Sequence, residues 1–121
     1  MTDVRVLLAD DEEIVRDAIG ALLEEDPRFR VVAAVATASA AAAAATTLQP
    51  DLAVIDVRMP GGGRAAIAAI REHSPETVVL VCSSMDDRYT RSTMAEAGAA
   101  AYVVKGDDDV LDAARGVMGL S

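Results

Sequence analysis

The sequence predicts an α/β domain with a single doubly wound, five-stranded parallel sheet and five helices. Short apolar runs alternate with longer segments of helical spacing along the 121 residues. The runs are apolar on both faces, which is typical of strands buried in a parallel sheet. Hydrophobic residues make up 52% of the chain and aromatic residues only 2%, so the core must be aliphatic. A chain of this length can bury such a core without disulfides or metal.

The first strand is expected over residues 4–9, a β-branched run that stops at two acids. A helix is expected over residues 12–25, ended by Asp26-Pro27. Its apolar residues recur at helical spacing and should form its core-facing side: Ile14, Val15, Ala18, Ile19, Leu22 and Leu23. Residues 31–35 form the second expected strand.

The alanine-rich run over residues 38–45 has high helix propensity and lies between two strand signals, so we expect a packed helix there. The third strand is expected over residues 52–55 and the third helix over residues 64–72. The fourth strand is expected over residues 77–82.

A weakly amphipathic helix is expected over residues 87–97, a fifth strand over residues 100–104 and a last helix over residues 107–118. Each strand is thus followed by a helix, which indicates helices on both faces of the sheet. Right-handed crossovers then leave only a few doubly wound arrangements. With no internal linker or repeat, we expect one domain over residues 1–121.

Composition excludes several classes of protein. The formal net charge of −9 disfavours nucleic acid and anionic membrane as direct partners. The single cysteine cannot form an internal disulfide. The first apolar run is too short to span a membrane and lacks a signal-peptide cleavage site. A cytoplasmic location is therefore the expectation.

Polar residues follow four of the predicted strands. Asp10 and Asp11 follow the first strand, Asp56 the third, Ser83 the fourth and Lys105 the fifth. The carboxyl ends of parallel strands form the ligand crevice of such a sheet, so these side chains should converge. Each has an ordinary explanation alone: acids cap helices, and a lone serine or lysine is usually a surface group. Their coincidence at one edge is far less expected by chance.

The combination suits phosphoryl transfer. Clustered carboxylates repel one another, and Mg²⁺ relieves that repulsion through oxygen ligands while keeping positions for phosphoryl oxygens. A carboxylate beside the ion can attack phosphorus and form an aspartyl phosphate. A lysine and a hydroxyl can stabilise the charge of the transferring group.

These residues lie in motifs that resemble the receiver domains of two-component response regulators, over essentially the whole chain. The motifs are Val6-Leu7-Leu8-Ala9-Asp10-Asp11-Glu12, Val54-Ile55-Asp56-Val57-Arg58-Met59-Pro60-Gly61, Ala97-Gly98-Ala99 and Tyr102-Val103-Val104-Lys105. The resemblance implies the flavodoxin-like receiver fold.

The resemblance also implies the roles of the site residues. Asp56 is the expected phosphoacceptor. Asp10, Asp11 and Asp56 are the expected magnesium ligands, joined by the backbone carbonyl of Arg58, with Asp11 the stronger candidate of the acidic pair for direct ligation.

Ser83 matches the switch hydroxyl that bonds the phosphoryl group, Lys105 the lysine that pairs with it, and Tyr102 the switch aromatic that turns inward after activation. The implied phosphodonor is a sensor histidine kinase. The implied output surface comprises the fourth helix, fifth strand and fifth helix, and a homodimer through that surface is a further expectation.

Three departures from the family pattern stand out. Gly106 follows Lys105, where proline is frequent. Ser84 stands where alanine is common. Gly61-Gly62-Gly63 replaces a Gly-hydrophobe-Asp-Gly loop, which predicts a mobile loop beside Asp56.

Two alternatives remain open: a degenerate receiver acting as a constitutive interaction module, and a small aspartyl-phosphate phosphotransferase. The latter commonly has a second acid two residues after the nucleophile, where this chain has Arg58. The sequence also leaves open whether the chain is the front of a longer regulator, with a DNA-binding or nucleotide-signalling output.

Other polar residues receive ordinary roles. His73 is expected at the surface by the end of the third helix, and Cys82 in the core. Asp107, Asp108 and Asp109 are expected to cap the last helix.

Overall fold

The computed structural model describes residues 3–121. Five parallel strands form one sheet in the order β2-β1-β3-β4-β5. Along the chain the elements are β1 (Val4–Ala9), α1 (Glu13–Leu23), β2 (Phe29–Val35), α2 (Ala38–Leu48), β3 (Leu52–Ile55), α3 (Gly63–His73), β4 (Val78–Ser83), α4 (Arg88–Ala97), β5 (Ala101–Val104) and α5 (Val110–Val117). The predicted fold class and the order of all ten elements are confirmed.

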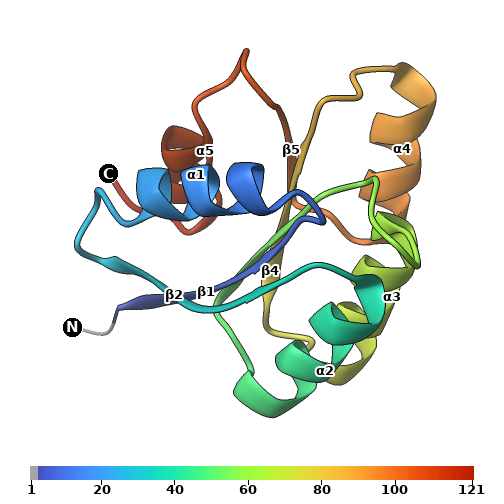
Figure 1. Cartoon of the computed structure of the whole chain (residues 1–121), viewed down its shortest axis with the longest axis horizontal. Coiled ribbons are helices and arrows are strands. Elements are labelled where there is room, and N and C mark those ends of the chain that lie inside the picture. The colour runs from blue at the N-terminus through green and yellow to red at the C-terminus, as the bar shows by residue number, and fades with distance from the viewer. Residues whose placement is uncertain (1–2) are drawn as a thin grey trace.

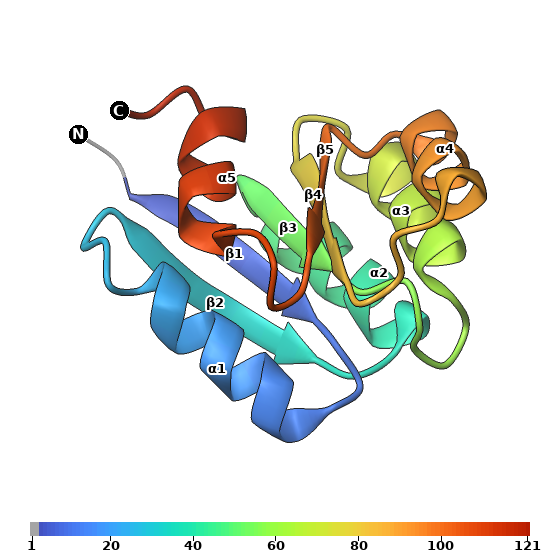
Figure 2. The ribbon, with the colours of Figure 1, turned by 90° about the horizontal axis from the view of Figure 1, so that it is seen from above.

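The helices form two layers, with α1 and α5 on one face of the sheet and α2, α3 and α4 on the other (Figure 1). Figure 2 shows the parallel strands running between these layers, with β1 and β3 inside the sheet. Among residues 3–121, no helix combines the length and apolarity needed to cross a bilayer.

Alternating side chains of each strand divide the core in two. In β1, Val6 and Leu8 pack toward α1 and α5, whereas Leu7 and Ala9 pack toward α2 and α3. This is the two-residue period of a strand with both faces buried. Phe29 is the only aromatic residue buried in the core among the described residues, as the composition predicts.

The alanine-rich segment is a packed helix, and it is longer than predicted. The Thr37 hydroxyl accepts a hydrogen bond from the Ala40 amide (3.0 Å) and caps the start of α2. The helix continues through two threonines to Leu48, and the Thr46 hydroxyl donates to the Ala42 carbonyl (2.8 Å). Gln49 then ends it in the left-handed region (φ 48°).

The last helix begins later than predicted. It starts at Val110, three residues after the predicted start at residue 107. The Asp108 carboxylate accepts from the Val104 amide (2.9 Å), which folds the preceding acids into a turn. Of the three acids predicted to cap this helix, Asp109 caps it, by accepting from the Asp112 amide (3.1 Å).

Part of the apolar side of α1 does not pack into the core. Ile19 and Leu23 are buried, but Ile14 is 85% exposed and Leu22 is 45% exposed. Ala18 is exposed as well, so the prediction that the whole stripe faces the core is wrong for these three residues.

Candidate functional site

Three carboxylates meet at the carboxyl edge of the sheet. Asp10 and Asp11 follow β1, and Asp56 follows β3, which pairs with β1 in the sheet. The Asp56 amide donates to the Ala9 carbonyl (3.0 Å) and so holds the two strand ends together. Each of the three acids offers one oxygen within 4.8 Å of the others. The structure thus brings together the acids that the sequence predicts as neighbours.

The three acids differ in exposure. Asp10 and Asp56 are buried, whereas Asp11 is exposed. The Asp10 carboxylate also accepts from the Glu12 amide (2.9 Å), which fixes its orientation at the start of α1. Two of the three carboxylates are therefore shielded from solvent, and the third is at the surface.

Lys105 reaches this cluster from the end of β5. Its Nζ lies 2.6 Å from an Asp10 oxygen and 3.5 Å from an Asp56 oxygen. Burial by itself would lower the pKa of Lys105, but the hydrogen bond to Asp10 and the charge of Asp56 outweigh it, so the pKa lies above its ordinary value. The lysine is therefore a fixed cation at neutral pH.

Asp56 is costly to keep charged, because it is buried and lies beside another acid. Burial raises the pKa of Asp56, and the charge of Asp10 acts in the same direction. Lys105 and the backbone amide of Arg58 oppose this rise without cancelling it. A carboxylate that is costly to keep charged is well placed to gain a covalent group or a cation.

The donor set fits a hard divalent cation. Its three carboxylates supply oxygen ligands, and the repulsion between the buried Asp10 and Asp56 is what an ion there would relieve. The Arg58 side chain is exposed. Ligation by the Arg58 carbonyl, inferred from the resemblance, stays a prediction.

Ser83 and Tyr102 are linked through one residue of the loop after β4. Ser83 is the last residue of β4, and its buried hydroxyl accepts from the Met85 amide (3.1 Å). The Tyr102 hydroxyl donates to the Met85 carbonyl (2.6 Å). Burial raises the pKa of Tyr102, while the neighbouring Ser83 hydroxyl and Arg91 guanidinium oppose that rise. Tyr102 is thus turned toward the β4–α4 loop.

Gly63, in the glycine loop after Asp56, stands where the backbone leaves no room for a side chain. A Cβ on Gly63 would lie 2.6 Å from the Asp56 carbonyl oxygen and 2.8 Å from the Val57 Cα. The Gly63 amide donates to the Val57 carbonyl (3.0 Å). The close approach of the α3 start to the Asp56 backbone is what requires glycine there. The predicted mobility of this loop stays a prediction.

The other two departures from the family pattern are Ser84 and Gly106. Ser84 is exposed next to Ser83. The Lys105–Gly106 peptide bond is trans, and Gly106 has a φ of 84°, where nothing would contact a Cβ. The Lys105 amide donates to the Ser83 carbonyl (2.9 Å), so the sheet itself places the lysine.

The residues given ordinary roles lie as expected. His73 is at the exposed end of α3, where its Nε2 lies 3.8 Å from Glu72. Cys82 is buried, and burial raises the pKa of its thiol to about 11. A thiol with such a pKa is protonated at neutral pH and poorly reactive.

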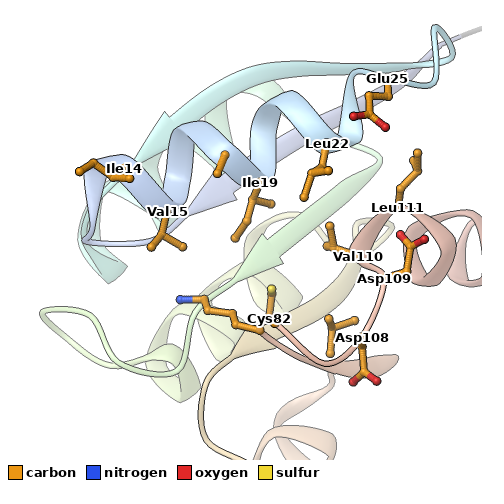
Figure 3. Close-up of a pocket in the computed structure, with 14 residues that line it drawn as sticks. Ile14, Val15, Ile19, Leu22, Glu25, Cys82, Asp108, Asp109, Val110 and Leu111 are labelled. Atoms are coloured by element: carbon orange, nitrogen blue, oxygen red, sulfur yellow. The ribbon is translucent and has the colours of Figure 1, made fainter.

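A cavity of about 500 Å³ adjoins the acidic site, between α1 and the start of α5. Figure 3 shows Val15, Ile19 and Leu22 on the side of α1 that faces Cys82 and Val110. Lys105 also lines the cavity. Sequence reasoning missed this cavity because it assigned the apolar residues of α1 to the core; their unusually wide stripe was the available signal.

Comparisons with known proteins agree with this geometry. The sequence model of the response regulator receiver domain matches residues 6–115. The chain is 35% identical over 113 residues to protein-glutamate methylesterase/protein-glutamine glutaminase 2 of Carboxydothermus hydrogenoformans, covering 91% of this chain and 32% of that protein. It is 31% identical over 108 residues to the oxygen regulatory protein NreC of Staphylococcus epidermidis, covering 88% and 50%. It therefore spans only about a third to a half of the length of these relatives.

Two solved structures are similar over nearly the whole chain. The signal receiver domain of the putative response regulator NarL from Mycobacterium tuberculosis has a TM-score of 0.91 at 28% identity, covering 98% of this chain and 99% of that one. A two-component response regulator of the LuxR family from Aurantimonas sp. also has a TM-score of 0.91, at 31% identity, covering 98% and 88%.

Proposed function

The chain belongs to the response regulator receiver family, and we propose that it is a phosphoacceptor switch with Asp56 as the acceptor. The observation that carries the proposal is the buried Asp56 carboxylate beside Asp10 and the Lys105 ammonium, 3.5 Å away. The donor is a phosphohistidine of a sensor histidine kinase. Phosphorylation changes the surface that the domain presents to its partners.

In the proposed reaction an Asp56 carboxylate oxygen attacks the phosphorus in line with the bond to the donor. The P–N bond of phosphohistidine breaks, its electron pair stays with the imidazole, and Asp56 becomes an acyl phosphate. Lys105 neutralises negative charge on the phosphoryl oxygens, and the Ser83 hydroxyl donates to one of them. Asp10, Asp11, Asp56 and the Arg58 carbonyl would hold Mg²⁺, which supplies charge neutralisation at the phosphoryl oxygens when bound.

The domain processes only its own phosphoryl group in this proposal, because Arg58 stands where aspartyl-phosphate phosphotransferases commonly have a second acid. We also propose that the chain is the receiver part of a longer cytoplasmic regulator. The relatives support this, because the chain matches only 32% of the length of one and 50% of the other. Its output surface comprises α4, β5 and α5, through which a homodimer would form. The net charge of −9 favours protein partners over nucleic acid for this part of the chain.

Phosphoryl uptake from a small donor tests the proposal. Incubation with acetyl phosphate and Mg²⁺ should add one phosphoryl group per chain, measured by intact-protein mass. The adduct should be removed by hydroxylamine, which cleaves acyl phosphates but not serine phosphates. EDTA should suppress the gain, because the three acids then lose their counter-ion. A hydroxylamine-stable adduct, or no gain with Mg²⁺ present, would count against the proposal.

A further inference from the structure

The loop between β4 and α4, residues 84–87, is held at both backbone groups of Met85. The Met85 amide donates to the Ser83 hydroxyl (3.1 Å), and the Met85 carbonyl accepts from the Tyr102 hydroxyl (2.6 Å). A hydroxyl oxygen that accepts from an amide still has its own proton to donate. The Met85 contact therefore sets the rotation of the Ser83 side chain, and with it the direction in which the Ser83 proton can point.

Arg91 of α4 contacts both Tyr102 and the β4–α4 loop. Its guanidinium carbon lies 4.7 Å from the centre of the Tyr102 ring. The same guanidinium binds Asp86, the residue after Met85, with Nε at 2.7 Å and Nη2 at 2.5 Å from one carboxylate oxygen. Arg91 thus contacts both the loop and the tyrosine that binds the loop.

The two contacts of Arg91 reinforce each other. An arginine over an aromatic ring can still bind a carboxylate through its N–H groups, so one side chain can make both contacts. Without Arg91, the Tyr102 ring and the Asp86 side chain would each lose the group that restricts it. Met85 would then keep only its two hydrogen bonds, and its position would be less well defined.

We propose that Arg91 is a positioning residue for phosphoryl transfer, which acts through Tyr102, Asp86 and Met85 to hold the Ser83 hydroxyl toward the phosphoryl group on Asp56. The inference rests on the proposed function, because it assigns a role in the same reaction. Arg91 does not touch the reacting atoms.

Initial rates of phosphoryl uptake from acetyl phosphate with Mg²⁺ test this role. Arg91→Ala should slow uptake about three- to fivefold, the effect that one surface ion pair and one cation–π contact can supply. Arg91→Lys, which keeps a cation over the ring, should recover part of the rate. Asp86→Asn should give an intermediate loss. Arg88→Ala is the matched control, because Arg88 is an exposed arginine of the same helix without an ion pair among the described residues.

Two further measurements separate positioning from a general loss of structure. In a Ser83→Ala background, Arg91→Ala should cause no additional loss of rate, because the group that it positions is gone. The chain has two tyrosines, so Tyr89→Phe leaves Tyr102 as the single tyrosine signal in NMR spectra. The ring signals of Tyr102 should shift in Arg91→Ala without any phosphodonor, and should not shift in Arg88→Ala.

The outcomes distinguish this inference from the proposed function. Normal uptake by Arg91→Ala, or an equal loss in the Ser83→Ala background, would overturn the positioning role and leave Asp56 as acceptor. Unshifted Tyr102 signals in Arg91→Ala would overturn it on structural grounds. Failure of the wild-type protein to take up phosphoryl groups would overturn both.

Discussion

Replacing Lys105 with methionine is expected to lower the free energy of unfolding at pH 7 by about 2–4 kcal/mol. This is slightly less than the about 3–5 kcal/mol for breaking a fully buried ion pair, because the Lys105 side chain is 18% exposed. The substitution leaves two buried carboxylates, Asp10 and Asp56, without the cation that lies 2.6 Å and 3.5 Å from them. Methionine keeps most of the apolar volume of the lysine stem, so the loss reports on charge. Denaturant unfolding in EDTA measures it.

The same variant should also take up phosphoryl groups at least about tenfold more slowly, since it lacks a fixed positive charge facing the phosphoryl oxygens. Arg64→Met is the control for removing a positive charge, because Arg64 is exposed and in no ion pair among residues 3–121. Lys105 is the only lysine of the chain. Its raised pKa can therefore be read directly from the single lysine ammonium signal in NMR spectra. Unchanged stability in Lys105→Met would show that the ammonium does not compensate the two acids.

Asp56→Asn is expected to have the opposite effect, with a gain of about 0.5–2 kcal/mol in unfolding free energy at pH 7, the usual size of a stabilising substitution. Burial raises the pKa of Asp56 in the folded protein. An acid with a raised folded pKa binds its proton more tightly when folded, so its charged form costs stability at neutral pH. Asparagine has nearly the same shape and carries no charge.

The gain should depend on pH in a defined direction. The pKa of Asp56 in the folded protein lies above the ordinary aspartate value of about 4. As the pH falls through this raised pKa, wild-type Asp56 becomes protonated, and the gain in unfolding free energy from asparagine disappears. Denaturant unfolding at pH 7 and pH 4 in EDTA measures both values. Asp11→Asn is the matched control, because Asp11 is exposed in the same cluster. An Asp56→Asn variant less stable than wild type at pH 7 would contradict the account.

Much of the fold was predictable because the strands are short, aliphatic and apolar on both faces. The order of elements followed from that pattern, and the convergence of Asp10, Asp56 and Lys105 followed from the topology. Boundaries were less predictable, since they depend on local hydrogen bonds. The Asp108 carboxylate binds the Val104 amide and delays α5, which no periodicity reveals.

Contacts between side chains from distant segments could not be predicted from the sequence. Arg91 and Tyr102 are eleven positions apart and belong to different elements, so nothing in their spacing indicates the 4.7 Å contact. The need for glycine at position 63 arises from the backbone of Asp56, seven residues earlier. Predicting the cavity beside α1 would have required knowing which apolar residues stay exposed, among them Ile14.

The most direct test of the central claim is to ask which of the three clustered acids carries the phosphoryl group. Wild type, Asp10→Asn, Asp11→Asn and Asp56→Asn are incubated with acetyl phosphate at saturating Mg²⁺, and intact-protein mass is followed over time. We expect one added phosphoryl group in wild type, slower addition in the Asp10 and Asp11 variants, and none in Asp56→Asn. A hydroxylamine-sensitive phosphoryl group on Asp56→Asn would show that another carboxylate is the acceptor.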